Sequence, residues 1–184
     1  PFRERIANYI NVLTAPTNLG KTFSIFNTQI KEAIDNGITH IIITAPDTMI
    51  HRQSIEAYEE MVWNATRITL HTKQGFRDFT KRNYPSVILL SNSKMCHAKD
   101  DIIKLKERIG PEKFMVLADE MHYGGTTHRD YVQRNTGYRP ATNSRSSYVF
   151  ANLLKNLSKD CKNIVSYTAT PLYEMKELGN DLYG

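Results

Sequence analysis

Short, continuous apolar runs recur along the chain, and they constrain its fold more than any other feature. Ile41–Ile43 is typical, because its three neighbouring aliphatic residues do not alternate with polar ones. Strands buried on both faces have this pattern, whereas strands with one solvated face alternate between apolar and polar residues. Short β-rich runs, most of them continuous in this way, predict strands at Tyr9–Thr14, Thr39–Thr44, Arg67–His71, Ser86–Ser91, Lys113–Ala118 and Asn163–Thr168.

Segments with helical periodicity separate these runs. The first has apolar residues on one face after Lys21 and is expected to end at Asp35-Asn36-Gly37, with Gly37 in the left-handed conformation. Repeated βα units predict an α/β fold, with an open, mostly parallel sheet and helices on both faces. Further helices are expected from a cap at Asp47 or Thr48 through Val62, over Asp100–Ile109, and from a cap at Ser146 or Ser147 through Leu157.

Length, composition and cysteine content exclude several classes of protein. The chain has 184 residues, 40% of them hydrophobic, which suits one domain with a packed core. No stretch approaches the roughly 18–20 apolar residues of a membrane span, so no membrane partner is expected. Cys96 and Cys161 lie too far apart for a disulfide framework or a cysteine-based zinc site, and they predict an intracellular, cytoplasmic protein with reduced thiols.

The net charge of +5 permits a nucleic-acid partner without demonstrating one. Two stretches carry much of the basic character. A polar, arginine-containing loop insertion is expected at residues 124–147, and a basic cluster surrounds an expected short helix at Lys73, Arg77, Lys81 and Arg82. Each stretch is open to two interpretations, a solvated surface or a contact with phosphates.

A phosphate-binding loop is predicted between the first strand and the first helix. Backbone N–H groups near Gly20, at the positive end of a helix dipole, suit a β-phosphate. Lys21 supplies a positive charge to the β- and γ-phosphate oxygens, and the Thr22 hydroxyl is suited to ligate Mg²⁺. Ala15 stands where the G-x-x-x-x-G-K-[ST] pattern has its first glycine. The predicted ATP-binding residues are Ala15, Pro16, Thr17, Asn18, Leu19, Gly20, Lys21 and Thr22.

Two acids end the strand predicted at Lys113–Ala118. Asp119 and Glu120 would lie at the carboxyl edge of a parallel sheet, which is where ligands bind in such folds. One carboxylate can hold Mg²⁺, and the next can orient and polarise the attacking water. A third motif, Ser166 to Pro171, follows the last strand, and the hydroxyls of Thr168 and Thr170 are suited to connect the nucleotide site to another surface.

The chain resembles the first RecA-like domain of superfamily 2 helicases and translocases in three segments and in their order. These segments are Ala15–Thr22, Asp119-Glu120-Met121-His122 and Thr168–Pro171. The Asp-Glu-x-His form resembles the DEAH/DExH side of that superfamily, in particular the type III restriction subunit (ResIII-like) ATPases. The resemblance covers nearly the whole chain. It implies a RecA-like P-loop NTPase domain that binds ATP and Mg²⁺ and acts on a nucleic acid, with DNA favoured over RNA.

The resemblance also assigns roles by position. Lys21 and Thr22 would be the Walker A lysine and a magnesium ligand, Asp119 would hold the metal, and Glu120 would be the catalytic base. His122 would couple the nucleotide state to Thr168, Ala169 and Thr170. Residues corresponding to a nucleic-acid-binding motif are Thr44, Ala45, Pro46 and Gln53. Ser91–Met95 occupies the place of a further nucleic-acid motif but matches it poorly.

Family motors also need a second RecA-like domain, which carries an arginine finger worth about 10³–10⁵ in rate. No second such domain fits in 184 residues. The chain alone is therefore expected to bind ATP–Mg²⁺ weakly and to hydrolyse it slowly or not at all. Two other functions stay open: a P-loop nucleotide switch or phosphotransferase that does not act on nucleic acid, and a degenerate domain that serves as a protein-binding scaffold.

Overall fold

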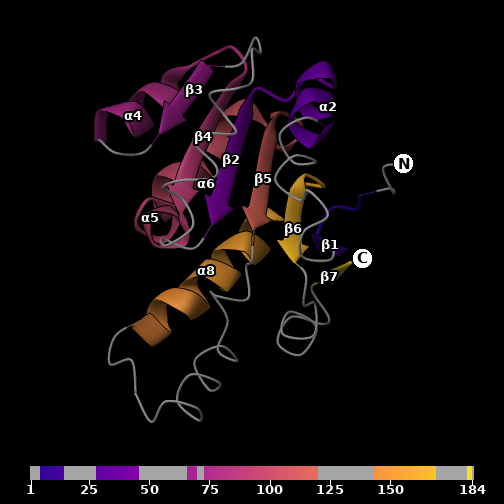
Figure 1. Cartoon of the computed structure of the whole chain (residues 1–184), viewed down its shortest axis with the longest axis vertical. Coiled ribbons are helices and arrows are strands. Elements are labelled where there is room, and N and C mark those ends of the chain that lie inside the picture. Colours follow the sequence, from indigo (N-terminus) through magenta and orange to yellow (C-terminus); the bar gives the residue numbers. More distant parts are fainter. Residues whose placement is uncertain are drawn as a thin grey trace.

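The computed structural model describes residues 5–14, 28–45, 66–69, 73–119, 143–168 and 182–183. Its strands form one sheet in the order β3-β4-β2-β5-β6-β1-β7, and every pairing is parallel. Figure 1 shows the strands side by side with helices around them. The strands are β1 (Ile10–Thr14), β2 (His40–Ala45), β3 (Thr66–Thr69), β4 (Ser86–Ser91), β5 (Phe114–Asp119), β6 (Ile164–Thr168) and β7 (Leu182–Tyr183).

Helices cover both faces of this sheet. The connections β3 to β4, β4 to β5 and β5 to β6 all run in one direction across the sheet, whereas β1 to β2 runs in the other. Right-handed crossovers therefore place the helix after β1 on the opposite face from the rest. The helices are α2 (Ile30–Asp35), α4 (Lys73–Lys81), α5 (Asn92–His97), α6 (Lys99–Ile109) and α8 (Asn143–Leu157), with a short 3₁₀ turn at Pro111–Lys113.

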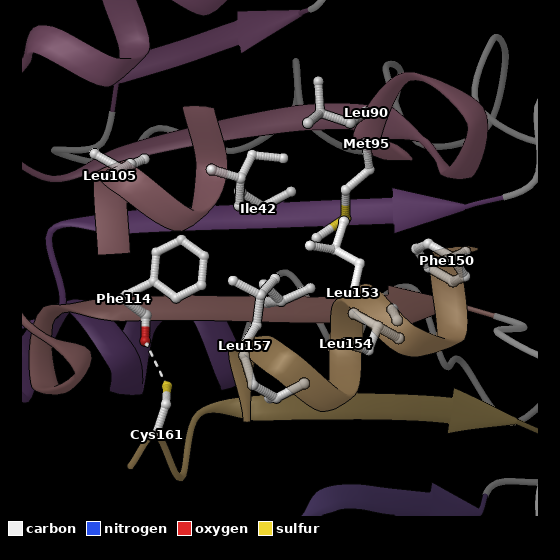
Figure 2. Close-up of a cluster of buried hydrophobic side chains, with 14 of the residues drawn as sticks. Ile42, Leu90, Met95, Leu105, Phe114, Phe150, Leu153, Leu154, Leu157 and Cys161 are labelled. Carbon is white, nitrogen blue, oxygen red and sulfur yellow. Dashed lines mark hydrogen bonds between the residues drawn. The ribbon is translucent and has the colours of Figure 1, made fainter. Parts of the chain in front are cut away.

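Two apolar clusters lie on opposite faces of the sheet, because successive side chains of each strand point to opposite sides. The larger cluster joins Ile42, Ile88 and Phe114 to residues of α4, α5, α6 and α8, including Leu153 and Leu157. Figure 2 shows part of this cluster, with Ile42 and Phe114 of the sheet close to Leu153 and Leu157 of α8. The Cys161 thiol donates to the Phe114 carbonyl oxygen at 3.7 Å. The smaller cluster packs Ile30 and Ala33 of α2 against the other face. The continuous apolar runs in the sequence are therefore strands buried on both faces.

The end of α2 follows the expected pattern. Gly37 has a φ of +86°, its N–H donates to the carbonyl of Ile34, and the N–H of Ile38 donates to the carbonyl of Ala33. This pair of bonds is the Schellman arrangement, and Ala33 and Ile38 add its apolar contact. The left-handed conformation predicted for Gly37 is confirmed.

Most expected elements are confirmed, with differences at particular residues. The six expected strands all form where the structure describes them, and α4 and α6 match the expected helices. The cap predicted at Ser146 or Ser147 is wrong, because α8 already begins at Asn143 and no Gly or Pro interrupts it. Residues 143–147 of the expected loop insertion are thus helical. The helix expected from Asp47 or Thr48 through Val62 lies outside the described residues, as does 124–142.

Two elements were not expected from the sequence. Helix α5 begins directly after β4, and the Ser91 hydroxyl caps it by accepting from the Lys94 N–H at 3.1 Å. Strand β7 has only two residues and pairs with β1 at the edge of the sheet. Within the parts of the chain that the structure describes, no helix is long and apolar enough to span a membrane.

A buried asparagine ties the segment before β1 to β6. The Asn11 side-chain oxygen accepts from the Ile6 N–H at 3.0 Å, and its amide nitrogen lies 3.2 Å from the carbonyl oxygens of Ile6, Lys162 and Ile164. Asn8, at a φ of +69°, adds a contact with the turn after α8 through the Asp160 N–H. The side chain of Asn11 thus provides hydrogen bonds to backbone groups of two segments that are partly or fully buried.

Replacing Asn11 by leucine should lower the free energy of unfolding by about 2–4 kcal/mol, because the backbone groups lose their hydrogen-bond partner and a larger side chain must fit a buried position. Urea denaturation followed by circular dichroism measures this change. Asn152 is exposed on α8, so Asn152→Leu is the matched control and should change stability by no more than about 0.5 kcal/mol. Equal stability of the Asn11 variant and the wild type would contradict this role.

His40, the first residue of β2, lies buried beside α4. Its Nδ1 is 2.8 Å from the Thr39 hydroxyl oxygen, and its ring meets Phe79 edge-on with ring centroids 5.1 Å apart. Burial lowers the pKa of His40, the backbone of Phe79 opposes this shift, and the positive charge of Arg108 adds to it. The folded protein therefore favours the neutral imidazole.

Because the folded-state pKa of His40 lies below the unfolded value, the unfolded chain binds more protons at acidic pH, and stability falls as pH decreases below about 6.5. His40→Gln should lose less stability than the wild type between about pH 7.5 and about pH 5.5, as measured by urea denaturation. His97→Gln, at an exposed histidine, should keep the wild-type pH dependence. An unchanged pH dependence in His40→Gln would contradict this assignment.

Candidate functional site

The carboxyl edge of the sheet brings the ends of three strands together. Thr14, the last residue of β1, is the register partner of Thr168 at the end of β6. On the other side of β6, Tyr167 is the register partner of Asp119, the last residue of β5. Strand β6 therefore lies between the strand that leads into Ala15–Thr22 and the strand that ends in the predicted acids. Ligands of open α/β sheets bind at this edge, near the place where the connections change direction.

The described residues include only part of the predicted site. They contain Thr44, Asp119 and Thr168, together with the backbone of Ala45. The structure therefore leaves the roles predicted for the site residues untested. Outside the described residues lie Ala15, Pro16, Thr17, Asn18, Leu19, Gly20, Lys21, Thr22, Pro46, Gln53, Glu120, His122, Ala169 and Thr170.

Asp119 and Thr168 occupy different environments at this edge. Asp119 is half-buried at the end of β5, and alternation from Leu117 places it on the face that α2 covers. Thr168 is fully buried, and alternation from Ile164 places it on the opposite face, the one that carries the larger cluster. A carboxylate that ends a buried strand, and is still partly accessible, can meet a ligand at this edge.

Beneath α2, a polar group of side chains lies between the helix and the sheet. The Arg5 guanidinium donates to the Gln29 side-chain oxygen at 2.9 Å and to the Asn163 side-chain oxygen at 3.4 Å. Burial lowers the pKa of Arg5, while Tyr167 and Glu32 oppose that shift. Arg5 thereby connects the first described segment to α2 and to the start of β6.

Tyr167 extends from β6 into this polar group. Burial raises the pKa of its hydroxyl, and Arg5 opposes that shift. The hydroxyl oxygen is buried and has no hydrogen-bond partner among the residues that the structure describes. The sequence indicated neither Arg5 nor Tyr167. An arginine five residues before a strand and a tyrosine inside an apolar run carry no spacing signal that would connect them.

Thr44 is fully buried at the end of β2, and its hydroxyl donates to the Asn92 side-chain oxygen at 2.5 Å. Ala45 and Ser91 are register partners, so β2 and β4 end side by side next to the first turn of α5. A nucleic-acid contact through the Thr44 hydroxyl would compete with Asn92. The sequence indicated Asn92 only as part of the poorly matching segment Ser91–Met95 and gave no sign of its bond to Thr44. Ser91, at the end of a buried strand, is a helix-cap signal.

The donors available to a metal ion are few in this part of the molecule. Among the described residues, no group of three or more His, Cys, Asp or Glu side chains could hold a metal ion together. Magnesium in nucleotide sites is commonly held by one or two carboxylates together with phosphate oxygens and water. The single carboxylate of Asp119 at the carboxyl edge fits that kind of donor set.

Comparisons with known proteins agree on the fold. The sequence matches no protein-family model, and a search of curated proteins finds no relative. A solved structure of a nuclease-deletion mutant of the Type ISP restriction-modification enzyme LlaGI, in complex with a DNA substrate mimic, is similar at a TM-score of 0.53 and 15% identity. It covers 89% of this chain, which spans 16% of that one.

A second similar structure is the ATP-dependent Type ISP restriction-modification enzyme LlaBIII bound to DNA. Its TM-score is 0.56 at 15% identity, and it covers 89% of this chain, which spans 12% of its length. At this identity the likeness shows the fold alone. Together with the parallel sheet and its helical layers, it confirms the α/β, RecA-like fold that the sequence predicts.

The Thr44–Asn92 hydrogen bond should contribute about 1 kcal/mol to stability as a pairwise term. Thr44→Val and Asn92→Ala should each destabilise the protein, and the double variant should lose about 1 kcal/mol less than the sum of the two. Urea denaturation of the four proteins measures this coupling. Strictly additive losses would show that the two side chains do not interact in solution.

Proposed function

We propose that this chain is the ATP-binding lobe of a nucleic-acid-dependent ATPase of the helicase or translocase type. The register of β1, β6 and β5 is the observation that carries this proposal. It makes Thr14 the partner of Thr168 and Tyr167 the partner of Asp119, so the strands that lead into the three predicted motifs are neighbours. These motifs must lie next to one another if the phosphate loop, the metal-binding acid and the coupling motif are to act on one nucleotide.

Each predicted site residue has a distinct role in the proposal. Backbone N–H groups beside Gly20 bind the phosphates, and Lys21 neutralises the β- and γ-phosphate oxygens. Thr22 and Asp119 would hold Mg²⁺, which supplies charge neutralisation on the phosphates when it is bound. Glu120 orients the attacking water and accepts its proton at a carboxylate oxygen.

His122 and the motif Thr168, Ala169 and Thr170 couple the nucleotide state to movement on the nucleic acid. The full burial of Thr168 at the end of β6 supports such a role, because a residue packed on several sides follows the movement of its neighbours. The finer assignment is to the DEAH/DExH side of superfamily 2, with a type III restriction subunit as the nearest kind. A second RecA-like domain would supply the arginine finger.

DNA is the proposed track, contacted through Thr44, Ala45, Pro46 and Gln53. Both similar structures are of restriction-modification enzymes with DNA or a DNA substrate mimic, which favours DNA over RNA. The net charge of +5 is compatible with a polyanionic partner. Movement on DNA powered by ATP would place this lobe in a restriction enzyme or a related motor.

Replacing the proposed base tests this function in the full-length protein. Glu120→Gln should leave the affinity for ATP–Mg²⁺ within about twofold of the wild type and reduce DNA-stimulated phosphate release by about 10²–10⁴, because the amide cannot accept the proton. Glu112→Gln, at an exposed glutamate next to β5, is the matched control and should keep full turnover. Undiminished turnover in Glu120→Gln would refute the assignment.

A further inference from the structure

Two helices carry most of the net charge of the chain. Residues 73–82 and 99–109 contain eight Lys and Arg against four Asp and Glu, a net +4 of the total +5. They form α4 with the residue after it and α6, which pack on the same face of the sheet. The charges of these two segments therefore lie on one face of the sheet, whereas the proposed nucleotide site lies at the ends of β1, β6 and β5.

The ends of these two helices meet at the amino edge of the sheet, since α4 leads into β4 and α6 leads through the 3₁₀ turn into β5. The Arg108 guanidinium donates to the Thr80 carbonyl oxygen and joins them directly. Strands β4 and β5 have six residues each, so this edge lies roughly 20 Å from the carboxyl edge. We call the cations gathered here the basic corner: Arg77, Lys81, Arg82, Lys104 and Arg108.

The cations of the basic corner are available to a partner. Arg77, Lys81, Lys104 and Arg108 are exposed, and Arg82 is half-buried. Within the described ranges of the chain, none of the five forms an ion pair, and the neighbouring acid Asp78 accepts from Gln74 instead. Direct ion pairs with acids of these ranges therefore do not neutralise their charges.

An aromatic ring lies beside these charges. Tyr84 is 49% exposed, and the Arg82 guanidinium lies 5.2 Å from the centre of its ring. One terminal nitrogen of Arg82 is buried and has no hydrogen-bond partner among the described residues. Stacking over the tyrosine ring fixes the plane of the guanidinium, and only its accessible donors, not the buried nitrogen, are available to phosphate oxygens.

We propose that the basic corner binds the phosphate backbone of a nucleic acid at the amino edge of the sheet. A nucleic-acid strand carries one negative charge per about 3.4 Å, so cations spaced one helical turn apart on two helices can each meet a phosphate. The inference rests on the proposed function and adds to it a second contact with the same partner. The basic corner would bind a flanking segment of the nucleic acid while the carboxyl edge of the sheet binds the nucleotide.

The test compares DNA binding by the full-length wild type and the variant Arg77→Ala/Lys81→Ala/Lys104→Ala. These side chains make no hydrogen bond or ion pair within the described residues, so the variant should melt at the wild-type temperature. Fluorescence anisotropy with a labelled duplex, across a salt series, should show weaker binding by about tenfold or more and a log–log salt slope that is shallower by about 2–3. ATP affinity, measured in parallel, should not change.

Lys31→Ala/Lys159→Ala/Lys162→Ala removes three exposed lysines elsewhere and is the matched control, which should keep the wild-type slope. An unchanged slope in the basic-corner variant would overturn this inference alone. If poly-glutamate competes for the basic corner as effectively as unlabelled DNA does, the partner of this surface would be an acidic protein. That result would also overturn the inference. A wild type that binds ATP but no DNA would overturn both this inference and the nucleic-acid part of the proposed function.

Discussion

The burial of the central strands on both faces is the constraint on which the rest of the structure depends. Ile41, Ile42 and Ile43 are each nearly inaccessible, although successive side chains point to opposite sides of the sheet. In this protein two layers of helices exclude water from the two sides, and the crossover connections that carry helices between strands go together with parallel pairing. Polar side chains can then lie at the strand ends, and the candidate site is at one of these ends.

The order of the strands in the sheet determines which residues become neighbours at the candidate site. Because β6 is inserted between β1 and β5, Thr168 and Tyr167 become neighbours of Thr14 and Asp119, which are remote in sequence. The buried contacts of Asn11 and Arg5 fix the segment before β1 against β6 and α2. Polar groups buried in this way are stable because they have hydrogen-bond partners, and they also specify one arrangement of these elements. The Tyr167 hydroxyl differs, since no described residue bonds to it.

The sequence predicts the sheet well because its signal is local. Short β-rich runs, most of them continuous and apolar, identified all six longer strands, and Gly37 identified the end of α2. Helix α5 escaped prediction because six residues are too few for a visible period, and the start of α8 because Asn143–Ser147 has no apolar periodicity. The Thr44–Asn92 bond and the Arg5 contacts join residues far apart in the chain, and only the folded topology brings them together. The roles predicted for Lys21, Glu120 and His122 stay predictions.

A crystal structure of the full-length protein with Mg²⁺ and a non-hydrolysable ATP analogue tests the central claim most directly. The account predicts triphosphate density against the backbone amides around Gly20, with the metal ion bound to the Asp119 carboxylate directly or through one water molecule. Nucleotide bound away from the carboxyl ends of β1, β6 and β5, or an Asp119 carboxylate turned away from the metal ion, would contradict it.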